Sequence, residues 1–253
     1  MTLHIFDRQM RRGAKADTSG ARVERAGPVV RQVGGDDDWN GILWSDLDAA
    51  GADAAIAEQV AYFGRLGRTF EWKLYSHDQP ADLGERLVRA GFTPEEPETL
   101  MVGRIGELHL DGEPPAGVRL RAVDDAAGVE LMMAVHAQAF GGDGSLVRHQ
   151  LLAQLAERPE ELVAVVAMAG EEPVSAARMQ LHPGTGFASL WSGGTVAAWR
   201  GRGLYRWLVA HRARLAAERG YAYLQVDAAP TSRPILARLG FAALATTTPY
   251  LSP

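Results

Sequence analysis

The fold is decided by residues 195–205, Thr-Val-Ala-Ala-Trp-Arg-Gly-Arg-Gly-Leu-Tyr, where an apolar strand ends, two glycines turn the chain and a helix begins. The first turn of that helix is crowded by three arginines, Arg200, Arg202 and Arg206. Free N–H groups and the helix dipole make this the helix end where positive side chains are least favourable. The glycines leave backbone amides uncovered, and such amides at a helix start bind phosphate oxygens. The stretch therefore predicts a site for a phosphorylated ligand.

The segments on both sides of this turn have the patterns of regular elements. Residues 187–196 are apolar enough for a strand, and one helix face is marked after the turn by Leu204, Trp207, Leu208, His211 and Leu215. Gly220 ends the predicted helix just before a second apolar strand, residues 221–226. The predicted order is strand, anion-binding turn, helix, strand.

A dinucleotide-binding unit uses the same order of elements. It requires a glycine where Arg206 stands, so that helix and strand pack closely, and an acidic residue at the end of the next strand. Asp227 meets the second requirement, but the glycine is missing. A nicotinamide-dinucleotide-binding protein is therefore kept as an alternative interpretation.

A second family fits more of the chain. Residues 200–205, Arg-Gly-Arg-Gly-Leu-Tyr, resemble the Arg/Gln-x-x-Gly-x-Gly/Ala turn by which GNAT acyltransferases hold the pyrophosphate of acetyl-CoA, although Tyr205 stands where the family has a small residue. Residues 234–241 are similar to the family's last helix and its Leu-Gly-Phe exit, and the resemblance covers about residues 117–253. It implies acetyl-CoA as cofactor, held by Thr195, Val196, Arg200, Gly201, Arg202, Gly203, Leu204, Tyr205, Ser232 and Arg233.

The predicted fold class is α/β (α+β), with a mixed, mostly antiparallel central sheet flanked by helices, as in GNAT proteins. Residues 162–169 and 174–182 read as a hairpin joined by a Gly-Glu-Glu-Pro turn, and two helices are predicted between residues 124 and 155. In the family, these helices flank the acceptor side. Paired glycines at Gly193 and Gly194 predict a bulge or the close approach of a ligand. The pantetheine arm is expected to pair with free backbone groups near Thr195 and Val196.

The chain is predicted to contain an internal duplication. Residues 87–92, Leu-Val-Arg-Ala-Gly-Phe, and residues 236–241, Leu-Ala-Arg-Leu-Gly-Phe, share the pattern Leu-x-Arg-x-Gly-Phe. The first copy lacks the anion-binding turn, so the N-terminal half resembles a degenerate GNAT domain. The predicted organisation is a tail at 1–27, the degenerate domain at 28–112 and the acetyl-CoA-binding domain at 116–253, with residues 11–27 as a mobile tail.

Composition excludes several classes of site. The sequence has no cysteine, which rules out thiolate metal ligands and a cysteine nucleophile, so a thiol for acyl transfer must come from a cofactor. The acidic run at 36–38 is interpreted as a solvated turn, and no metal site is predicted. A formal net charge of -5 argues against general nucleic-acid binding. No apolar run reaches the roughly 18 residues of a membrane-spanning helix, so we expect a cytoplasmic protein without a membrane partner.

The sequence does not identify a general acid or base. The tyrosine and asparagine that many GNAT proteins use fall at Leu236 and Ala229, and the strand before the turn contains no glutamate. Polar residues that can replace them are Asp227, Ser192 and Tyr250, with His182 interpreted as a surface histidine. A polar cluster in the first copy is formed by Glu71, His77 and Asp78. It is interpreted as surface loop polarity, with a position facing the acceptor pocket as the alternative.

The predicted activity is an acetyl-CoA-dependent N-acyltransferase that moves an acetyl group to the amine of a small-molecule acceptor by direct attack on the thioester. The missing acid and base support an alternative, a CoA-binding sensor or structural module without turnover.

Overall fold

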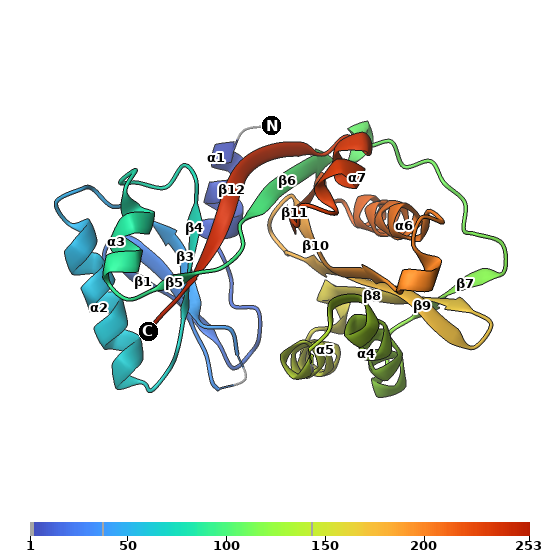
Figure 1. The fold of residues 1–253 in the computed structure, drawn as a ribbon, viewed down its shortest axis with the longest axis horizontal. Coiled ribbons are helices and arrows are strands. Elements are labelled where there is room, and N and C mark those ends of the chain that lie inside the picture. The colour runs from blue at the N-terminus through green and yellow to red at the C-terminus, as the bar shows by residue number, and fades with distance from the viewer. Residues whose placement is uncertain (1–2, 37, 143) are drawn as a thin grey trace. The chain divides into compact units, whose positions relative to one another are not determined.

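The computed structural model describes residues 3–36, 38–142 and 144–253, and the chain forms two compact units (Figure 1). The first unit contains residues up to Leu100 together with Asp227–Pro230 and Ala243–Pro253, and the second contains Met101–Val226 and Thr231–Ala242. Both are mixed α/β structures in which mostly antiparallel strands are flanked by helices, so the predicted fold class is confirmed.

In the first unit, strands pair in the order β1-β2-β3-β4-β12, and β5 also pairs with β12. All of these pairs are antiparallel except β3 with β4. The strands are β1 (Arg22–Ala26), β2 (Val29–Val33), β3 (Gly41–Ser45), β4 (Glu71–Tyr75), β5 (Thr93–Pro94) and β12 (Ala242–Leu251), and the helices are α1 (Leu3–Phe6), α2 (Ala52–Arg65) and α3 (Leu83–Arg89). The core of this unit contains Phe63, Trp72 and Leu87.

In the second unit, the order is β7-β8-β9-β10-β11, and only the pair β10 with β11 is parallel among these described strands. Figure 1 shows α4 and α5 on one face of this sheet and α6 and α7 on the other. The strands are β7 (Val118–Ala122), β8 (Leu162–Ala169), β9 (Glu172–Leu181), β10 (Phe187–Thr195) and β11 (Tyr223–Ala228), and the helices are α4 (Ala126–Phe140), α5 (Ser145–Glu157), α6 (Leu204–Glu218) and α7 (Arg233–Arg238). The last two residues of β11, Asp227 and Ala228, are counted with the first unit. Strand β6 (Glu98–Arg104) contains the boundary between the units.

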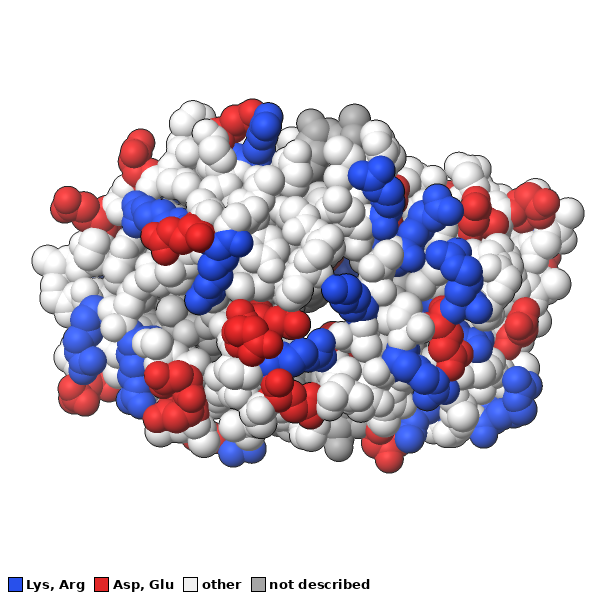
Figure 2. Space-filling view, turned by 180° about the vertical axis from the view of Figure 1, so that it is seen from behind, with Lys and Arg blue, Asp and Glu red and all other residues white. Residues whose placement is uncertain are grey.

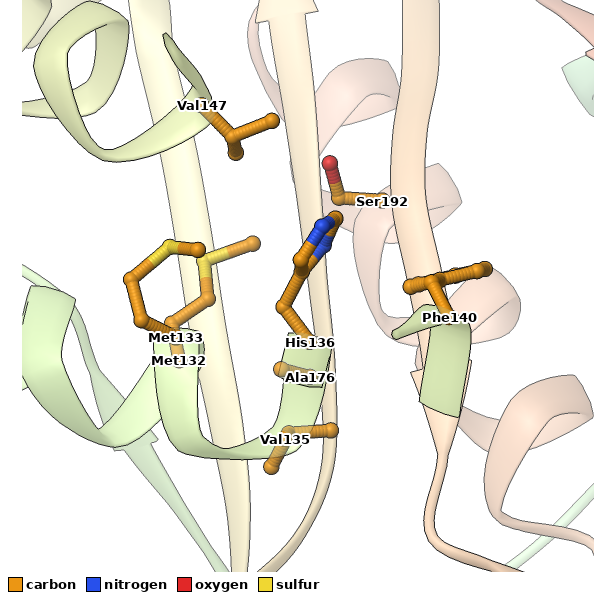
Figure 3. Close-up of a pocket in the computed structure, with 8 residues that line it drawn as sticks. All are labelled: Met132, Met133, Val135, His136, Phe140, Val147, Ala176 and Ser192. Atoms are coloured by element: carbon orange, nitrogen blue, oxygen red, sulfur yellow. The ribbon is translucent and has the colours of Figure 1, made fainter. Parts of the chain in front are cut away.

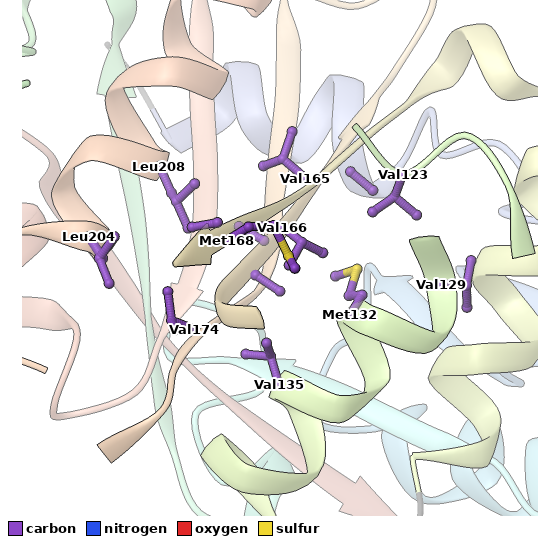
Figure 4. Packing of buried hydrophobic residues seen from close by; sticks show 14 of the residues in the cluster. Val123, Val129, Met132, Val135, Val165, Val166, Met168, Val174, Leu204 and Leu208 are labelled. Atoms are coloured by element: carbon purple, nitrogen blue, oxygen red, sulfur yellow. The ribbon is translucent and has the colours of Figure 1, made fainter. Parts of the chain in front are cut away.

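The core of the second unit explains why its strands are made of consecutive apolar residues. Strand β8 is buried along almost its whole length, because α4 and α6 both contribute side chains to the same core (Figure 4). Met132 and Val135 come from α4, and Leu204 and Leu208 come from α6. Asp125 caps α4 by accepting a hydrogen bond of 2.6 Å from the amide of Gly128.

The two Leu-x-Arg-x-Gly-Phe segments have the same geometry. Phe92 donates its amide to the carbonyl of Leu87 at 3.0 Å, and Phe241 donates to Leu236 at 3.1 Å. The glycine of each segment lies in the left-handed region, with φ of 93° and 96°, and the flanking Leu and Phe are buried in both. Each segment closes a helix that follows a parallel β-helix-β unit, β3-α2-β4 in one case and β10-α6-β11 in the other. The similarity therefore extends from sequence to backbone.

The compact units differ from the predicted domain boundaries at both ends of the chain. Strand β12 pairs with β4, with Thr247 opposite Tyr75 and Leu251 opposite Glu71, so the last strand belongs to the first unit. Residues 22–26, predicted as part of a tail, form β1. The predicted boundary at residues 112–116 assumed that each unit is one continuous stretch of sequence. The first unit is not continuous, because it also contains residues from the C-terminal end of the chain.

Arg11 corrects the prediction of a mobile tail further. Its guanidinium is buried, forms a two-point ion pair with Asp78 at 2.9 and 2.7 Å, and lies 4.0 Å from the centre of the Tyr75 ring. Asp7 adds a contact of 3.0 Å to the same guanidinium and also meets His77. Asp78 and His77 are therefore structural partners of the N-terminal segment, and the interpretation of this pair as surface polarity is wrong.

The surface carries charges of both signs. On the face seen in Figure 2, basic and acidic side chains are intermixed. Within the described residues, no helix combines the length and apolar character needed to cross a bilayer. Asp38 of the acidic run caps its own turn through Gly35, and Asp37 lies outside the described residues.

Candidate functional site

The start of α6 presents a row of free backbone donors. Gly203 is the residue before the helix, with φ of 85°, and Gly201 has φ of 75°. The amides of residues 201–206 donate no hydrogen bond to any residue that the structure describes, and the helix has neither a side-chain cap nor an acidic residue in its first turn. Free amides at a helix start, together with the helix dipole, form a site for an anion such as a pyrophosphate.

The three arginines of the turn surround these amides with positive charge. Arg200 donates from Nε to the carbonyl of Thr195 at 3.1 Å, and the Arg202 guanidinium lies 4.4 Å from the centre of the Trp199 ring. Arg206 is exposed on the first turn of α6. None of the three pairs with a carboxylate in the part of the chain that the structure describes. Cations without a counterion next to free amides are suited to a polyanionic ligand.

Strand β10 separates from β11 before it reaches the turn. The two strands pair from Phe187 and Tyr223 to Ser189 and Gln225, and β10 then continues to Thr195. Its register with β9 shifts between Trp191 and Gly194, and Ser192 has φ of 50°, which confirms the predicted bulge. The separation leaves the β11 side of β10 open beyond Ser189.

The paired glycines have a structural reason other than contact with a ligand. A Cβ atom on Gly193 would lie 2.9 Å from a ring carbon of Tyr205, and one on Gly194 would lie 2.8 Å from Phe140 and 2.9 Å from Ala139. The missing side chains therefore let α6 and α4 pack closely on the two faces of β10.

The backbone groups at the end of β10 already form hydrogen bonds at Val196. Its amide donates to the carbonyl of Val174 at 3.0 Å, and its carbonyl accepts from the amide of Trp199 at 2.9 Å. Thr195 uses its hydroxyl with Ser175 at 2.8 Å. The Val196 amide is therefore used by β9, and its carbonyl, already bonded within the short turn, keeps one lone pair for a further donor.

Tyr205 brings Ser232 to the start of α6. The two side chains are hydrogen bonded, which places the residue before α7 beside the anion-binding turn. Burial raises the pKa of the Tyr205 hydroxyl, against the opposite effects of Arg212 and of Ser232. Burial also lowers the pKa of Arg212 to about 10, since this arginine donates only to the carbonyls of Leu208 and Arg178 among the described residues. Arg233 is exposed at the start of α7.

The catalytic candidates are distributed over both units. Asp227 belongs to the first unit, where one carboxylate oxygen lies 2.5 Å from Lys73 Nζ and the other is buried with no hydrogen-bond partner among the described residues. Burial alone would lower the pKa of Lys73, but the Asp227 carboxylate outweighs it and raises that pKa above its usual value. Tyr250 packs against the core of the first unit. Ser192 lies in the second unit with the turn, and Leu236 is fully buried.

His182 is not a free surface histidine. Its Nε2 lies 2.7 Å from the hydroxyl of the buried Ser189, and burial lowers its pKa to about 4. The imidazole is therefore neutral at pH 7, and its partner on β10 is already fixed.

This shift predicts a loss of stability in acid. In the unfolded chain His182 titrates near its ordinary value of 6.5, so protonation favours unfolding as the pH falls from 6.5 towards 4. We expect His182 to account for a loss of about 3 kcal/mol across that window. In the His182→Gln variant, the urea concentration at the unfolding midpoint should change less between pH 6.5 and pH 4 than in the parent. The same substitution at the exposed His149 serves as control, and equal slopes in both variants would contradict the prediction.

A pocket in the second unit lies between α4, α5, β9 and β10 (Figure 3). It is lined by Met133, Val135, Phe140 and Val147 together with His136 and Ser192. The space of about 200 Å³ between these side chains includes open solvent and leaves no room for a water molecule inside. Sequence patterns predicted the two helices but not His136. The signal in the sequence was a histidine four residues before Phe140 in an otherwise apolar stretch.

No protein-family model matches the sequence, and no curated protein matches it in sequence. Solved structures do match in fold. A GCN5-related N-acetyltransferase from Kribbella flavida is 22% identical with a TM-score of 0.73, over 100% of this chain and 96% of that one. A tandem GNAT protein from the clavulanic acid biosynthesis pathway is 11% identical with a TM-score of 0.63, over 93% and 84%.

A third similar structure is a GCN5-related N-acetyltransferase from Sphaerobacter thermophilus, 15% identical with a TM-score of 0.62, over 92% of this chain and 75% of that one. These matches extend over both compact units and therefore include the first unit, in which the anion-binding turn is missing. The chain has the fold of the GCN5-related N-acetyltransferases.

Proposed function

We propose that the protein is a cytoplasmic acetyltransferase that moves the acetyl group of acetyl-CoA to the amine of a small molecule. The observation that carries the proposal is the row of free amides at residues 201–206, flanked by arginines without a carboxylate partner. Acetyl-CoA supplies an acetyl group activated as a thioester. Arg200, Gly201, Arg202, Gly203, Leu204 and Tyr205 hold its pyrophosphate, and Ser232 and Arg233 lie at the start of α7, which Tyr205 joins to the turn.

The acyl-CoA site belongs to the second unit alone, and the chain is a tandem pair with a degenerate first copy. At the corresponding helix start of the first unit, Asp48 takes the place of a ligand. Its carboxylate accepts from the amide of Gly51 at 2.7 Å, and its carbonyl accepts from Ala52 at 3.1 Å. Asp53 adds a negative charge to the first turn of α2. These features are unfavourable for phosphate.

The direct reaction needs a neutral amine and a proton for the departing thiolate. Ser192 is the candidate that shares a unit with the turn, and its bulged backbone directs it towards the pocket. Leu236, in the position of the family's tyrosine, is buried in the core and has no proton to give. The second candidate function, a CoA-binding module without turnover, is favoured by this missing acid.

Calorimetry with two ligands tests the cofactor. We expect acetyl-CoA to bind in the micromolar range, on the order of -7 to -8 kcal/mol, and NAD not to bind. Binding of NAD without binding of acetyl-CoA would contradict the proposal. Release of free thiol in the presence of an amine library then separates the two functions, since the module binds acetyl-CoA and releases no thiol with any acceptor.

A further inference from the structure

We propose that the protein forms a dimer with two-fold symmetry through α2 and α3 of the first unit, with the α2 helices of the two copies packed antiparallel. This contact uses none of the residues that we assign to acetyl transfer. Three observations carry the inference: an open groove between the two helices, an exposed face of α2 with small side chains, and the order of the charges along that helix.

Helices α2 and α3 are neighbours in the first unit (Figure 1), and an open groove runs between them. Its volume is about 510 Å³, so it has room for the side chains of a partner. It is lined by Ile56, Ala57, Val60 and Ala61 of α2 and by Arg86 and Arg89 of α3. Coverage of its apolar wall by a second apolar surface releases water, which favours association.

The charged residues of the groove already have partners. Arg86 pairs with Asp53 and with Asp82, in both cases at 3.0 Å. Arg89 lies 3.9 Å from Glu85. A small anion would therefore compete with carboxylates for these arginines, and a small cation would compete with the arginines for the carboxylates. This balance of charge beside an apolar wall favours a protein surface over a small ion as the occupant.

The exposed face of α2 has small side chains in place of the polar ones that surface helices usually carry. Ala54, Ala57, Ala61 and Gly64 are all exposed, and their spacing of three and four residues places them on one face of the helix. No atom lies within 4 Å of the position of a Cβ on Gly64, so nothing in the described chain covers that end of the face. Small side chains let two helix axes approach to about 8 Å, the near end of the range for packed helices.

The order of charges along α2 favours a second copy of the same helix in the opposite direction. Asp53 and Glu58 lie in its N-terminal half, and Arg65 is its last residue. Glu58 and Arg65 are exposed and form no ion pair among the described residues. When Ala57 lies opposite Ala61 of the second copy, Asp53 lies opposite Arg65, and the two-fold axis forms the same contact twice. Antiparallel helix dipoles add to this attraction, whereas a parallel pair would place like charges together.

Sedimentation velocity of the full-length protein tests the dimer. A contact made by one pair of helices is at the small end of protein interfaces, so we expect a dissociation constant in the micromolar range. The dimer should weaken at high salt, because exposed ion pairs are screened. A protein that sediments as a monomer at about 100 µM and low salt would overturn the inference.

A bulky substitution locates the contact. Ala61→Arg places a long side chain on the small face of α2 and should raise the dissociation constant of the dimer at least about tenfold. Arginine has nearly the helix propensity of alanine, so α2 should stay folded. Ala217→Arg, at an exposed alanine of α6, is the matched control and should leave the dimer unchanged. Equal dissociation constants for the two variants would contradict a contact through α2. Calorimetry with acetyl-CoA should give the parent affinity for Ala61→Arg, so the dimer and the proposed function are tested independently.

Charge reversal tests the antiparallel direction. Glu58→Arg adds a positive charge that faces Arg65 of the second copy, and Arg65→Glu brings a negative charge opposite Asp53 and Glu58. Each variant alone should dimerise at least about tenfold more weakly than the parent. An equimolar mixture should form a heterodimer, because the new arginine of one chain then faces the new glutamate of the other, and this recovery also shows that both variants are folded. If the parent dimerises but the mixture stays monomeric, the antiparallel pairing of α2 is wrong.

Discussion

Gly203→Glu should abolish acetyl-CoA binding while the protein stays folded. Gly203 has φ of 85°, and no atom lies within 4 Å of the position of a Cβ, so the glutamate has room. Its carboxylate would compete for the free amides of residues 201–206 and repel the pyrophosphate. We expect Kd to rise by more than about a hundredfold in calorimetry. Backbone strain at a left-handed position costs about 1–2 kcal/mol, which leaves a folded protein.

Gly220→Glu provides the matched control. Gly220 has φ of 82° and equally open surroundings, and it follows the other end of α6. The substitution therefore introduces the same charge and the same backbone strain on the same helix. We expect this variant to bind acetyl-CoA as the parent does and to lose similar stability in urea. If Gly203→Glu binds with unchanged affinity, or if both variants lose binding equally, the anion is not held at the start of α6.

The parts of the fold that could be predicted are those encoded by neighbouring residues. The turn after β10 follows from Gly201 and Gly203, and the cap of α4 follows from Asp125, because each signal acts within a few residues. The Leu-x-Arg-x-Gly-Phe segments belong to the same class, since their hydrogen bonds connect residues five positions apart. Local chemistry therefore located the proposed pyrophosphate site.

The parts that could not be predicted depend on contacts between distant residues. The residues of β12 predict a strand, but the neighbouring sequence contains no signal that Thr247 lies opposite Tyr75. Arg11 is likewise an unremarkable residue until Asp78, far along the chain, meets it in a buried ion pair. The pocket around His136 combines four elements whose pairing is equally invisible in a single sequence. Strand topology and buried polar contacts therefore could not be predicted from the sequence.

The ion pair of Asp227 with Lys73 leads to a second large expected effect. Asp227→Ala should lower the free energy of unfolding by about 3 kcal/mol, because it leaves the Lys73 ammonium without its anion in a largely buried site. The side chain of Lys73 is 19% exposed, so partial contact with water limits the loss. Urea denaturation measures the change. Arg104→Ala, which removes one member of an exposed ion pair with Glu107, should change stability by less than about 1 kcal/mol.

The double variant Lys73→Met with Asp227→Leu distinguishes a structural role of this ion pair from a catalytic role of Asp227. Replacement of a buried ion pair by apolar residues of similar size is often neutral for stability, so the double variant should recover most of the loss. A general base contributes on the order of 10²–10⁴ to the rate. One Asp227 oxygen is already occupied by the hydrogen bond from Lys73, and we therefore expect the double variant to keep its rate of acetyl transfer within about tenfold of the parent. A stable double variant that is more than about a hundredfold slower, with acetyl-CoA affinity unchanged, would instead identify Asp227 as the base.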